Sequence, residues 1–414
     1  MSIVKFIRTL LKLKGLRVKN FRFSDYSKKL WLGVKPHKNG ALCPTCLRRC
    51  KIIRTLDKER RWQDLPVAGR TVYLTYTPRE IDCPTHGRAQ EKIPWAAPNA
   101  RVTYRFEYAL LFYAMNMTQA VAAELLKIAS STFSDILHRC IERTRATHKI
   151  RCLKSIGVDE ISYRKGHLYA TIVYDLDRSC VVWIGKGKAR DTIDGFFKEK
   201  LSKYQREAIQ FASCDMSETF IGAIETWCPN ATLVLDRFHI VQALNKAVDE
   251  VRKEEWRKAN KESRKALKGL RWLIYRHSSN RSKKDTQTLK SLYMGNRRIH
   301  RSWVLKDEFE QFWDFLNIKD AEAFLDSWCK TAIRSRLDSI KSFVKTIRKH
   351  KHRLLPFVET HLTNAIAEGV NRIIKIVKNR ASGFRNLDAF KDLIYLTVGD
   401  VNIPEQIPSK FRAI

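Results

Sequence analysis

Residues 155–162 read Ser-Ile-Gly-Val-Asp-Glu-Ile-Ser and open a series of β-strand patterns in the middle of the chain. Similar patterns follow at residues 169–175 and 180–184, with the turn-forming Asp177-Arg-Ser between them. These three patterns predict an antiparallel meander. Helix and strand patterns then alternate over residues 191–204, 209–215, 218–227 and 232–236, before a long helix. The predicted order of elements is βββαβαβα.

This order is typical of an α/β, RNase H-like fold, in which the first and fourth strands are neighbours in the sheet. Asp159 and Asp215 follow the apolar residues of those two strands, so the fold would set them side by side. Two carboxylates this close repel each other unless a cation lies between them. Asp236 also follows an apolar strand, so the spacing alone leaves open which two aspartates pair.

A hard divalent cation, Mg²⁺ or Mn²⁺, suits such oxygen ligands. Two of these ions bridging a phosphodiester can activate the attacking oxygen and stabilise the leaving oxygen. The predicted chemistry is therefore phosphoryl transfer without a covalent protein intermediate.

A third carboxylate lies on a helix predicted over residues 363–378. Its predicted apolar stripe consists of Ile366, Val370, Ile373 and Val377. Its polar face carries Asn364, Glu368, Asn371 and Lys375. We predict that Glu368 is the third metal ligand; the alternative is an exposed glutamate beside a cationic neighbour.

Two short knuckles in the N-terminal part predict a zinc ribbon. Cys43 and Cys46 are separated by two residues, as are Cys83 and His86, and this spacing lets each pair reach one tetrahedral ion. The strand pattern around residues 70–77 lies between the knuckles. Four protein ligands would make the zinc structural. Cys50 is a rival ligand, and the alternative interpretation is a set of thiols without metal.

Residues 118–139 predict a helix-turn-helix, with a short break at residues 127–131. The apolar residues at helical spacing are Val121, Leu125, Ile128, Phe133, Ile136 and Leu137. The second helix would enter the major groove of DNA; a packing hairpin is the alternative. The candidate DNA-contacting residues on this helix and on the Glu368 helix are Thr132, Ser134, Arg139, Lys375, Lys378 and Arg380.

The charge balance favours a polyanionic partner. The 414 residues include 79 Lys and Arg against 43 Asp and Glu, which leaves a formal net charge of +36. No uninterrupted apolar run of about 20 residues occurs, so we expect a cytoplasmic protein that does not enter a membrane. Its 10 scattered cysteines suit free thiols and metal ligands rather than disulfides.

Residues 241–355 are basic, rich in tryptophan and helical in pattern, and we predict an all-helical insertion that grips phosphate backbones. Most of its tryptophans are expected in the core. We predict a zinc-ribbon domain at residues 1–98 and a helix-turn-helix domain at residues 99–150. The catalytic core is predicted in two parts, at residues 151–250 and 356–414, with the helical insertion at residues 251–355 between them.

Taken together, these motifs resemble the ISL-three family of insertion-sequence transposases, in the right order over nearly the whole chain. Besides the knuckles and the helix-turn-helix, the motifs are Pro94-Trp95-Ala, Gly157-Val-Asp159-Glu, Arg164-Lys-Gly-His167-x-Tyr169, Ser213-Cys-Asp215-Met-Ser, Asp236-Arg-Phe-His239, Asn364-Ala-Ile-Ala-Glu368-Gly-Val-Asn371 and Gly383-Phe-Arg-Asn. The sequence departs from many relatives at His86, where they carry a fourth ribbon cysteine.

The resemblance implies that Asp159, Asp215 and Glu368 form a catalytic Asp-Asp-Glu triad. It also implies that Asp236 and His239 lie near the active site. The implied activity is cleavage and joining of double-stranded DNA, at the terminal inverted repeats of a mobile element and at a target.

Two element ends must be brought together, so a homodimer or larger assembly is expected. The expected location is the bacterial cytoplasm, at the nucleoid when the protein is bound to DNA. Two alternatives remain open: a domesticated DNA-binding regulator without cleavage activity, and a nuclease or resolvase on the same scaffold.

Overall fold

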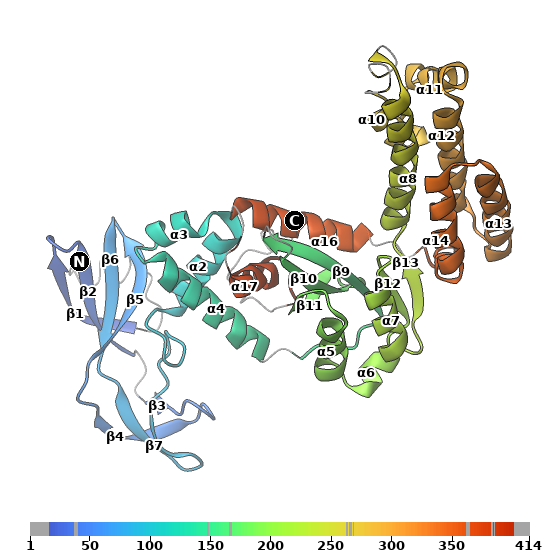
Figure 1. Ribbon diagram of the computed structural model, residues 1–414. Helices are drawn as coiled ribbons and strands as arrows, with labels where there is room; N and C mark the ends of the chain where they lie inside the picture. Colours follow the sequence, from blue (N-terminus) through green and yellow to red (C-terminus); the bar gives the residue numbers. More distant parts are fainter. Residues whose placement is uncertain are drawn as a thin grey trace. The chain divides into compact units, whose positions relative to one another are not determined.

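The centre of the computed structural model is a five-stranded sheet (Figure 1). Its strands are β9 (Ser155–Arg164), β10 (Leu168–Asp175), β11 (Cys180–Lys186), β12 (Phe211–Cys214) and β13 (Thr232–Leu235). They lie in the order β11-β10-β9-β12-β13. The first three strands are antiparallel, whereas β12 runs parallel to both β9 and β13. This topology confirms the predicted RNase H-like core and the pairing of its first and fourth strands.

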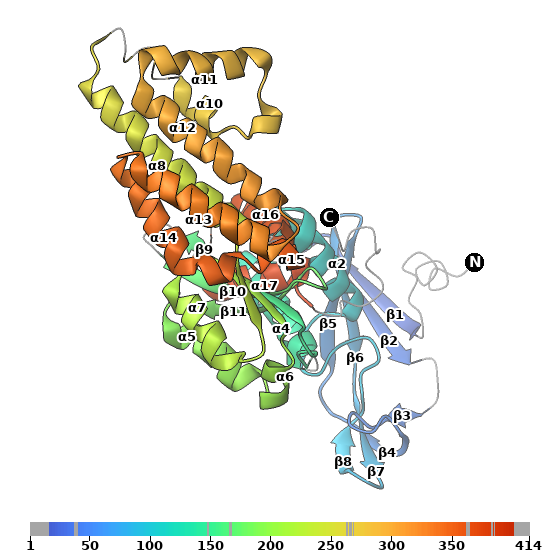
Figure 2. The same ribbon diagram turned by 90° about the vertical axis from the view of Figure 1, so that its right-hand side faces the viewer.

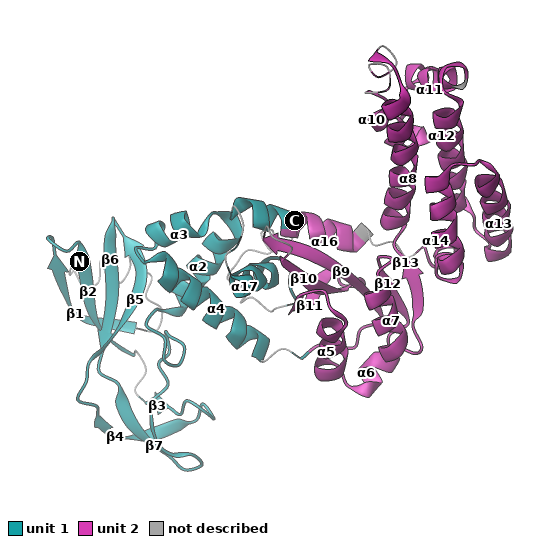
Figure 3. Ribbon diagram, in the orientation of Figure 1, with its two compact units in different colours: residues 1–149, 375–414 teal, residues 150–374 magenta. Residues whose placement is uncertain are grey.

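The structure describes residues 16–36, 40–146, 149–164, 168–261, 264, 267, 269–361, 365–381, 384 and 386–400. The chain divides into two compact units, one of residues 1–149 with 375–414 and one of residues 150–374 (Figure 3). The five-stranded sheet belongs to the second unit. Parts of three quoted motifs, residues 165–167, residue 364, and residues 383 and 385, lie outside the described residues.

The helices between the strands pack on the sheet through their apolar faces. They are α5 (Arg190–Lys200), α6 (Lys203–Glu207) and α7 (Glu218–Trp227). Phe196, Phe220 and Ile224 from α5 and α7 are buried in one cluster with Val158 and Val234 of the sheet. The helix predicted over residues 191–204 is two helices, because Ser202 caps the start of α6 with its side chain.

The described residues between β13 and residue 361 are mostly helical. Their helices are α8 (Arg237–Lys258), α10 (Leu270–Tyr275), α11 (Lys283–Gly295), α12 (Arg297–Glu310), α13 (Ile318–Arg334), α14 (Asp338–Leu354) and α15 (Phe357–Thr360), with single 3₁₀ turns at Ser278–Asn280 and Gln311–Asp314. α8 packs against both α12 and α14 (Figures 1 and 2). No strand occurs among the described residues of 241–355, as predicted.

Aromatic side chains fill the core of this helical insertion. The Phe309 ring contacts the rings of Trp313, Trp328 and Phe343, and the indole of Trp328 donates a hydrogen bond to the Leu305 carbonyl. Trp303, Trp313 and Trp328 are buried, whereas Trp256 and Trp272 are 40% and 69% exposed. The expectation that most of these tryptophans belong to the core is confirmed.

The helix that carries Glu368 is α16 (Ala365–Arg380), and α17 (Leu387–Val398) follows it. The buried apolar residues of α16 are Ala367, Val370, Ile374 and Val377. The predicted stripe was wrong at two positions, because Ile366 is 38% exposed and Ile373 is only half-buried. Consecutive buried residues of α16 are three, four and three positions apart, whereas those of the predicted stripe are four, three and four positions apart. Asn364 lies outside the described residues.

The N-terminal part of the first unit contains two separate four-stranded sheets. One consists of β1 (Leu16–Ser24), β2 (Lys29–Pro36), β6 (Arg70–Tyr76) and β5 (Arg60–Val67), in that order. The other consists of β3 (Ala41–Leu42), β4 (Arg49–Thr55), β7 (Arg79–Cys83) and β8 (Gly87–Gln90). The strand predicted near residues 70–77 exists as β6, but it belongs to the first sheet and not to the sheet of the knuckles.

Three helices follow, α2 (Tyr104–Asn116), α3 (Gln119–Leu125) and α4 (Ser130–Ala146). The break between α3 and α4 includes Lys127, whose φ of 56° lies in the left-handed region. Val121 and Leu125 were expected in the interface of the two helices but are each 49% exposed. α3 is held instead by Ala122 and Ala123, which are buried, because small residues let the helices approach closely.

Among the described helices, none combines the length and the apolar composition needed to cross a lipid bilayer.

Candidate active site and zinc site

Three aspartates lie in a row across neighbouring strands, with Asp159 in the middle of β9 and Asp215 and Asp236 directly after β12 and β13. Cys214 in β12 pairs with Val158 in β9 and with Leu235 in β13. The next residue along each strand is an aspartate, so the backbones of Asp159, Asp215 and Asp236 are adjacent across the sheet. The hydrogen bond from the Asp236 amide to the Cys214 carbonyl, 3.0 Å long, continues the ladder to this point. The sheet therefore brings Asp159 and Asp215 together as predicted, with Asp236 on the far side of Asp215.

Both carboxylate oxygens of Asp159 accept a hydrogen bond. Its Oδ1 accepts a hydrogen bond of 2.7 Å from the Glu160 amide, and its Oδ2 accepts one of 2.7 Å from Asn371 Nδ2. Burial raises the pKa of Asp159 and the charge of Asp215 adds to that rise, while the two hydrogen bonds and the nearby His239 oppose it. The site thus keeps two carboxylates close together in a poorly hydrated place, which favours a bound cation.

Asn371 connects α16 to the sheet. Its Oδ1 accepts a hydrogen bond of 2.5 Å from the Tyr174 hydroxyl in β10. Burial, and then the charge of Asp159, raise the pKa of Tyr174 well above its usual range, so the hydroxyl stays protonated and donates. Because a hydroxyl donor fixes the amide oxygen toward Tyr174, the amide nitrogen must face Asp159. Tyr174 therefore sets the orientation in which Asn371 binds the carboxylate.

Glu368 precedes Asn371 by three residues and lies in the first turn of α16. Residues three apart share one face of a helix, with Cα atoms separated by about 4.5 Å along the axis. Because Asn371 contacts Asp159 directly, Glu368 is one helical turn from the carboxylate row and on the same side of α16. Its side chain is exposed. The third predicted carboxylate is thus on the helix that contacts β9, but among the described side chains its oxygens do not join those of Asp159 and Asp215 in one cluster of ligand atoms within 4.8 Å.

Asp236 and His239 form the start of α8. Asp236 is the N-cap residue, and its Oδ1 accepts a hydrogen bond of 3.1 Å from the Phe238 amide. His239 Nε2 lies 3.6 Å from Asp236 Oδ2, and His239 is close enough to Asp159 to lower the pKa of that carboxyl. The predicted location of this pair, beside the aspartate row, agrees with these contacts.

Asn371 and Tyr174 had no predicted role, although their hydrogen bonds form the described link between α16 and Asp159. Asn371 was placed on the polar face of its helix, and its spacing of three from Glu368 was a usable signal. Tyr174 carried no signal, because a tyrosine within an apolar strand is ordinarily a core residue. Its hydroxyl matters only through a contact 197 residues away in sequence.

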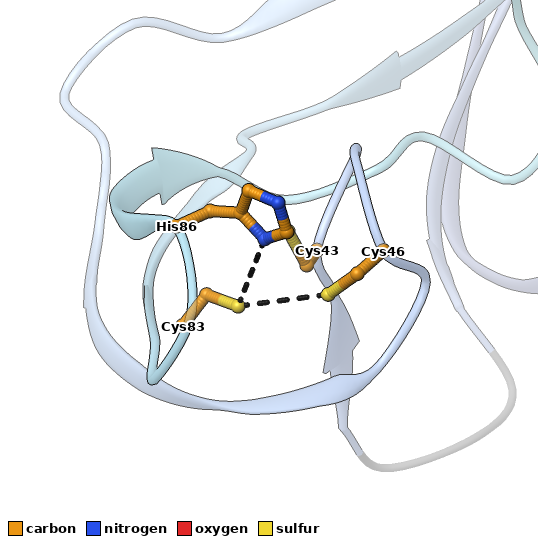
Figure 4. Close-up of side chains that lie close together, drawn as sticks. All are labelled: Cys43, Cys46, Cys83 and His86. Carbon is orange, nitrogen blue, oxygen red and sulfur yellow. Dashed lines mark hydrogen bonds between the residues drawn. The ribbon is translucent and has the colours of Figure 1, made fainter.

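Cys43, Cys46, Cys83 and His86 meet in the second N-terminal sheet (Figure 4). Their ligand atoms all lie within 4.8 Å of one another. Cys46 Sγ is 3.6 Å from Cys83 Sγ, and His86 Nδ1 is 3.7 Å from Cys83 Sγ and 3.8 Å from Cys43 Sγ. Ligands placed tetrahedrally around zinc would be about 3.5 to 3.8 Å apart. The cluster is therefore compatible with one zinc ion.

The chemistry of the cluster also suits a metal. A hydrogen bond with His86 lowers the pKa of the Cys83 thiol to about 6, so this sulfur is largely thiolate near neutral pH. Cys50, the rival ligand, is not one of the four clustered residues, and its thiol donates to the Arg48 carbonyl at 3.4 Å. The three cysteines and the histidine form the predicted donor set, without Cys50.

We expect purified protein to contain about one tightly bound zinc ion per chain. Cys83→Ser should lose this ion, because three ligands bind zinc far more weakly than four, whereas Cys50→Ser should keep it. Metal analysis by plasma mass spectrometry measures both. Equal zinc loss in the two variants, or no zinc in the wild-type protein, would contradict the assignment.

The candidate DNA-contacting residues differ in their surroundings. Thr132 and Lys375 are exposed, and the Ser134 hydroxyl accepts a hydrogen bond from Gln119 Nε2. Arg139 pairs with the buried Glu107, which Arg143 also binds. Arg380 donates to the carbonyls of Ala114 and Met115 at the end of α2.

The DNA contacts of these residues stay predictions, and so does that of the half-buried Lys378. Arg139 and Arg380 also link helices, because Arg139 joins α4 to α2 and Arg380 joins α16 to α2.

Comparison with known proteins places the fold and site in a defined class. A family model described as "Transposase", for enzymes of the Asp-Asp-Glu type, matches residues 156–394. The "Helix-turn-helix domain of transposase family ISL3" matches residues 91–141. The chain is thus a DNA transposase, an enzyme that binds DNA. The chain belongs to the ISL3 family, the ISL-three family named above, and this family implies a divalent metal ion as catalytic cofactor.

Named relatives cover most of the chain. The transposase for insertion sequence element IS1001 of Bordetella parapertussis is 27% identical over 375 residues, 88% of this chain and 91% of that protein. The transposase for IS1557 of Mycobacterium tuberculosis strain CDC 1551 / Oshkosh is 26% identical over 363 residues, 82% of this chain and 81% of that protein. A chain of the Drosophila P element transposase strand transfer complex matches 70% of this chain and 90% of its own length, at 8% identity and a TM-score of 0.35.

Proposed function

We propose that this transposase binds the terminal inverted repeats of an insertion sequence and catalyses metal-dependent cleavage and transfer of DNA strands. The observation that carries the proposal is the direct hydrogen bond from Asn371 to Asp159. It joins the helix of Glu368 to the part of β9 where Asp159 is adjacent to Asp215. A DNA-binding regulator without cleavage activity would have no need of adjacent aspartates on the sheet joined in this way to the helix of Glu368.

In this proposal Asp159, Asp215 and Glu368 are the catalytic residues and hold Mg²⁺ or Mn²⁺. Their carboxylate oxygens are ligands that these hard ions prefer, and the excess negative charge of the row suits a divalent cation. When bound, the metal would polarise the phosphodiester and neutralise charge on the attacking and leaving oxygens.

The chain's own residues keep the ligands in place. The Asn371 amide and the Glu160 amide orient the Asp159 carboxylate, while the Ser217 amide, 2.9 Å from Oδ1, orients Asp215. Fixed carboxylates need little rearrangement during the reaction, which is the main protein contribution to this type of chemistry.

The remaining parts are assigned to DNA recognition and assembly. We propose that α4 enters the major groove through Thr132 and Ser134, with Arg139, Lys375, Lys378 and Arg380 contacting DNA, and that the zinc site is structural. Bringing two element ends together requires at least two DNA-binding surfaces, so we propose a homodimer or larger assembly on DNA.

A cleavage assay tests the proposed function. The substrate is duplex DNA that carries the inverted repeats flanking this reading frame, incubated with the full chain and Mg²⁺ or Mn²⁺. We expect nicks at the repeat ends and, with a target plasmid present, joined products. Tight binding to the repeats without cleavage in either metal would support the regulator instead.

We also expect strongly salt-dependent DNA binding. With a net charge of +36, the protein should release many counterions from DNA, and its affinity should fall roughly 10³-fold or more between about 50 mM and about 200 mM salt. Fluorescence anisotropy with a labelled duplex measures this slope. An affinity that is flat over this range would rule out an interface dominated by phosphate contacts.

A further inference from the structure

An open, cationic groove of 1020 Å³ lies on the sheet of β1, β2, β6 and β5, within the first compact unit. It is lined by residues of β1, β2, β5 and β6, by Lys58 and Glu59 just before β5, and by Asn99 and Arg101 between β8 and α2. Neither the family assignment nor the proposed active site gives this sheet a role. The groove belongs to the same compact unit as the helix-turn-helix, so DNA is the first partner to consider.

The strand register places the groove on the outer face of the sheet. Asn20 pairs with Gly33, Gly33 pairs with Thr75, and Thr75 pairs with Arg61, which makes one continuous row across all four strands. The alternate residues of β2 and β6, such as Leu32 and Leu74, are buried on the opposite face. One face of the sheet therefore belongs to the core, and the other is the floor of the groove.

The groove is strongly cationic. Five of its lining residues carry a positive charge, against the single acid Glu59: Arg22, Lys58, Arg60, Arg61 and Arg101. Within the described part of the chain, none of these five cations forms an ion pair with a carboxylate. Surface cations usually find acidic neighbours, so this uncompensated cluster favours a polyanion that supplies the negative charge.

Aromatic rings hold two of the arginines in place. The guanidinium of Arg22 lies 4.6 Å from the ring centroid of Trp31, and that of Arg61 lies 5.7 Å from the ring of Tyr73. The two rings stack on each other, with centroids 6.3 Å apart. Stacking fixes the planar guanidinium and leaves its N–H groups free to bind phosphate oxygens.

We propose that this groove, the sheet groove, binds the sugar–phosphate backbone of duplex DNA, separately from the helix-turn-helix. Cations on the rings of Trp31 and Tyr73 favour phosphate contacts over base stacking, which argues for a duplex rather than a single strand. The contact would add affinity without reading sequence. The inference rests on the proposed binding of element ends, and it adds to the helix-turn-helix a second surface that binds the same DNA.

Charge reversal of the two ring-held arginines tests the sheet groove. We expect Arg22→Glu with Arg61→Glu to weaken duplex binding roughly 10- to 100-fold, equally for repeat and unrelated sequences, and to lower the salt slope by about two. The matched control is Lys198→Glu with Lys200→Glu on α5, two exposed lysines with the same total change in charge. Arg22→Lys with Arg61→Lys should retain most of the affinity.

Three readouts make the outcome decisive. Circular dichroism and zinc content should stay at wild-type values, which excludes unfolding of the N-terminal sheets. Binding of the charge-reversed protein that equals the control would overturn the proposal, and so would loss of single-stranded binding alone. If wild-type protein cleaves element ends but the groove variant binds normally, only this inference fails; absence of wild-type cleavage would instead contradict the proposed function.

Discussion

Asp159→Asn, Asp215→Asn and Glu368→Gln will each reduce DNA cleavage by at least about 10³-fold while leaving DNA binding intact. Each change keeps the size of the side chain but removes one negative charge from the proposed metal site. A metal site that loses a carboxylate ligand forfeits several kcal/mol of stabilisation of the transition state, which corresponds to about three orders of magnitude in rate. Single-turnover cleavage of a labelled repeat duplex, together with its dissociation constant, measures both effects.

A matched control separates this effect from a general change in charge. Asp191 is an exposed aspartate on α5, within the same unit as the triad, and Asp191→Asn should cleave DNA at the wild-type rate. Full cleavage by any one of the three triad variants would remove that residue from the catalytic set. Cleavage by all three would refute the proposed site.

Asn371→Ala will reduce the cleavage rate by about 10- to 100-fold, the usual effect of removing a residue that orients a metal ligand. Asn371 is a positioning residue, since it donates to Asp159 and accepts from Tyr174 rather than contacting the reacting atoms. Without it, the Asp159 carboxylate keeps only its hydrogen bond from the Glu160 amide, and α16 loses its described link to the strand. The rate should partly recover at high Mn²⁺ concentration, because excess metal compensates for a weakened site.

Asn379→Ala is the control on the same helix, because Asn379 is exposed on α16. It should match the wild-type protein in rate and in metal dependence. Asn371→Ala also leaves the buried Tyr174 hydroxyl without its acceptor and should lower the unfolding temperature, so the rates are compared well below the unfolding midpoints of both variants. An Asn371→Ala protein with unchanged rate and unchanged Mn²⁺ dependence would show that this contact does not position Asp159.

The sequence predicted the catalytic core well because apolar strand residues followed by an aspartate carry a strong local signal. The apolar residues before Asp159 and Asp215 predicted both strands, and the order of elements predicted their pairing. α7 also begins and ends at the predicted residues. Local periodicity is sufficient in these places because each element buries one whole face against the same core.

Errors arose where the partner of an element decides the outcome. β6 was recognised as a strand, but only tertiary pairing shows that it joins β2 and β5 rather than the knuckles. Val121 is apolar at helical spacing and still exposed, because its neighbours Ala122 and Ala123 make the contact. The Asn371 contact with Asp159 joins residues 212 apart in sequence, a distance over which periodicity carries no information.

The measurement that tests the central claim most directly is Mn²⁺ binding to the wild-type protein and to Glu368→Gln, by electron paramagnetic resonance with the repeat duplex present. Glu368 is the decisive residue, since it alone comes from a helix, whereas Asp159 and Asp215 lie side by side on the sheet. We predict that Glu368→Gln weakens Mn²⁺ binding by at least about 10-fold, as Asp159→Asn does. Wild-type affinity in Glu368→Gln, beside a clear loss in Asp159→Asn, would show that the three carboxylates do not share one metal site.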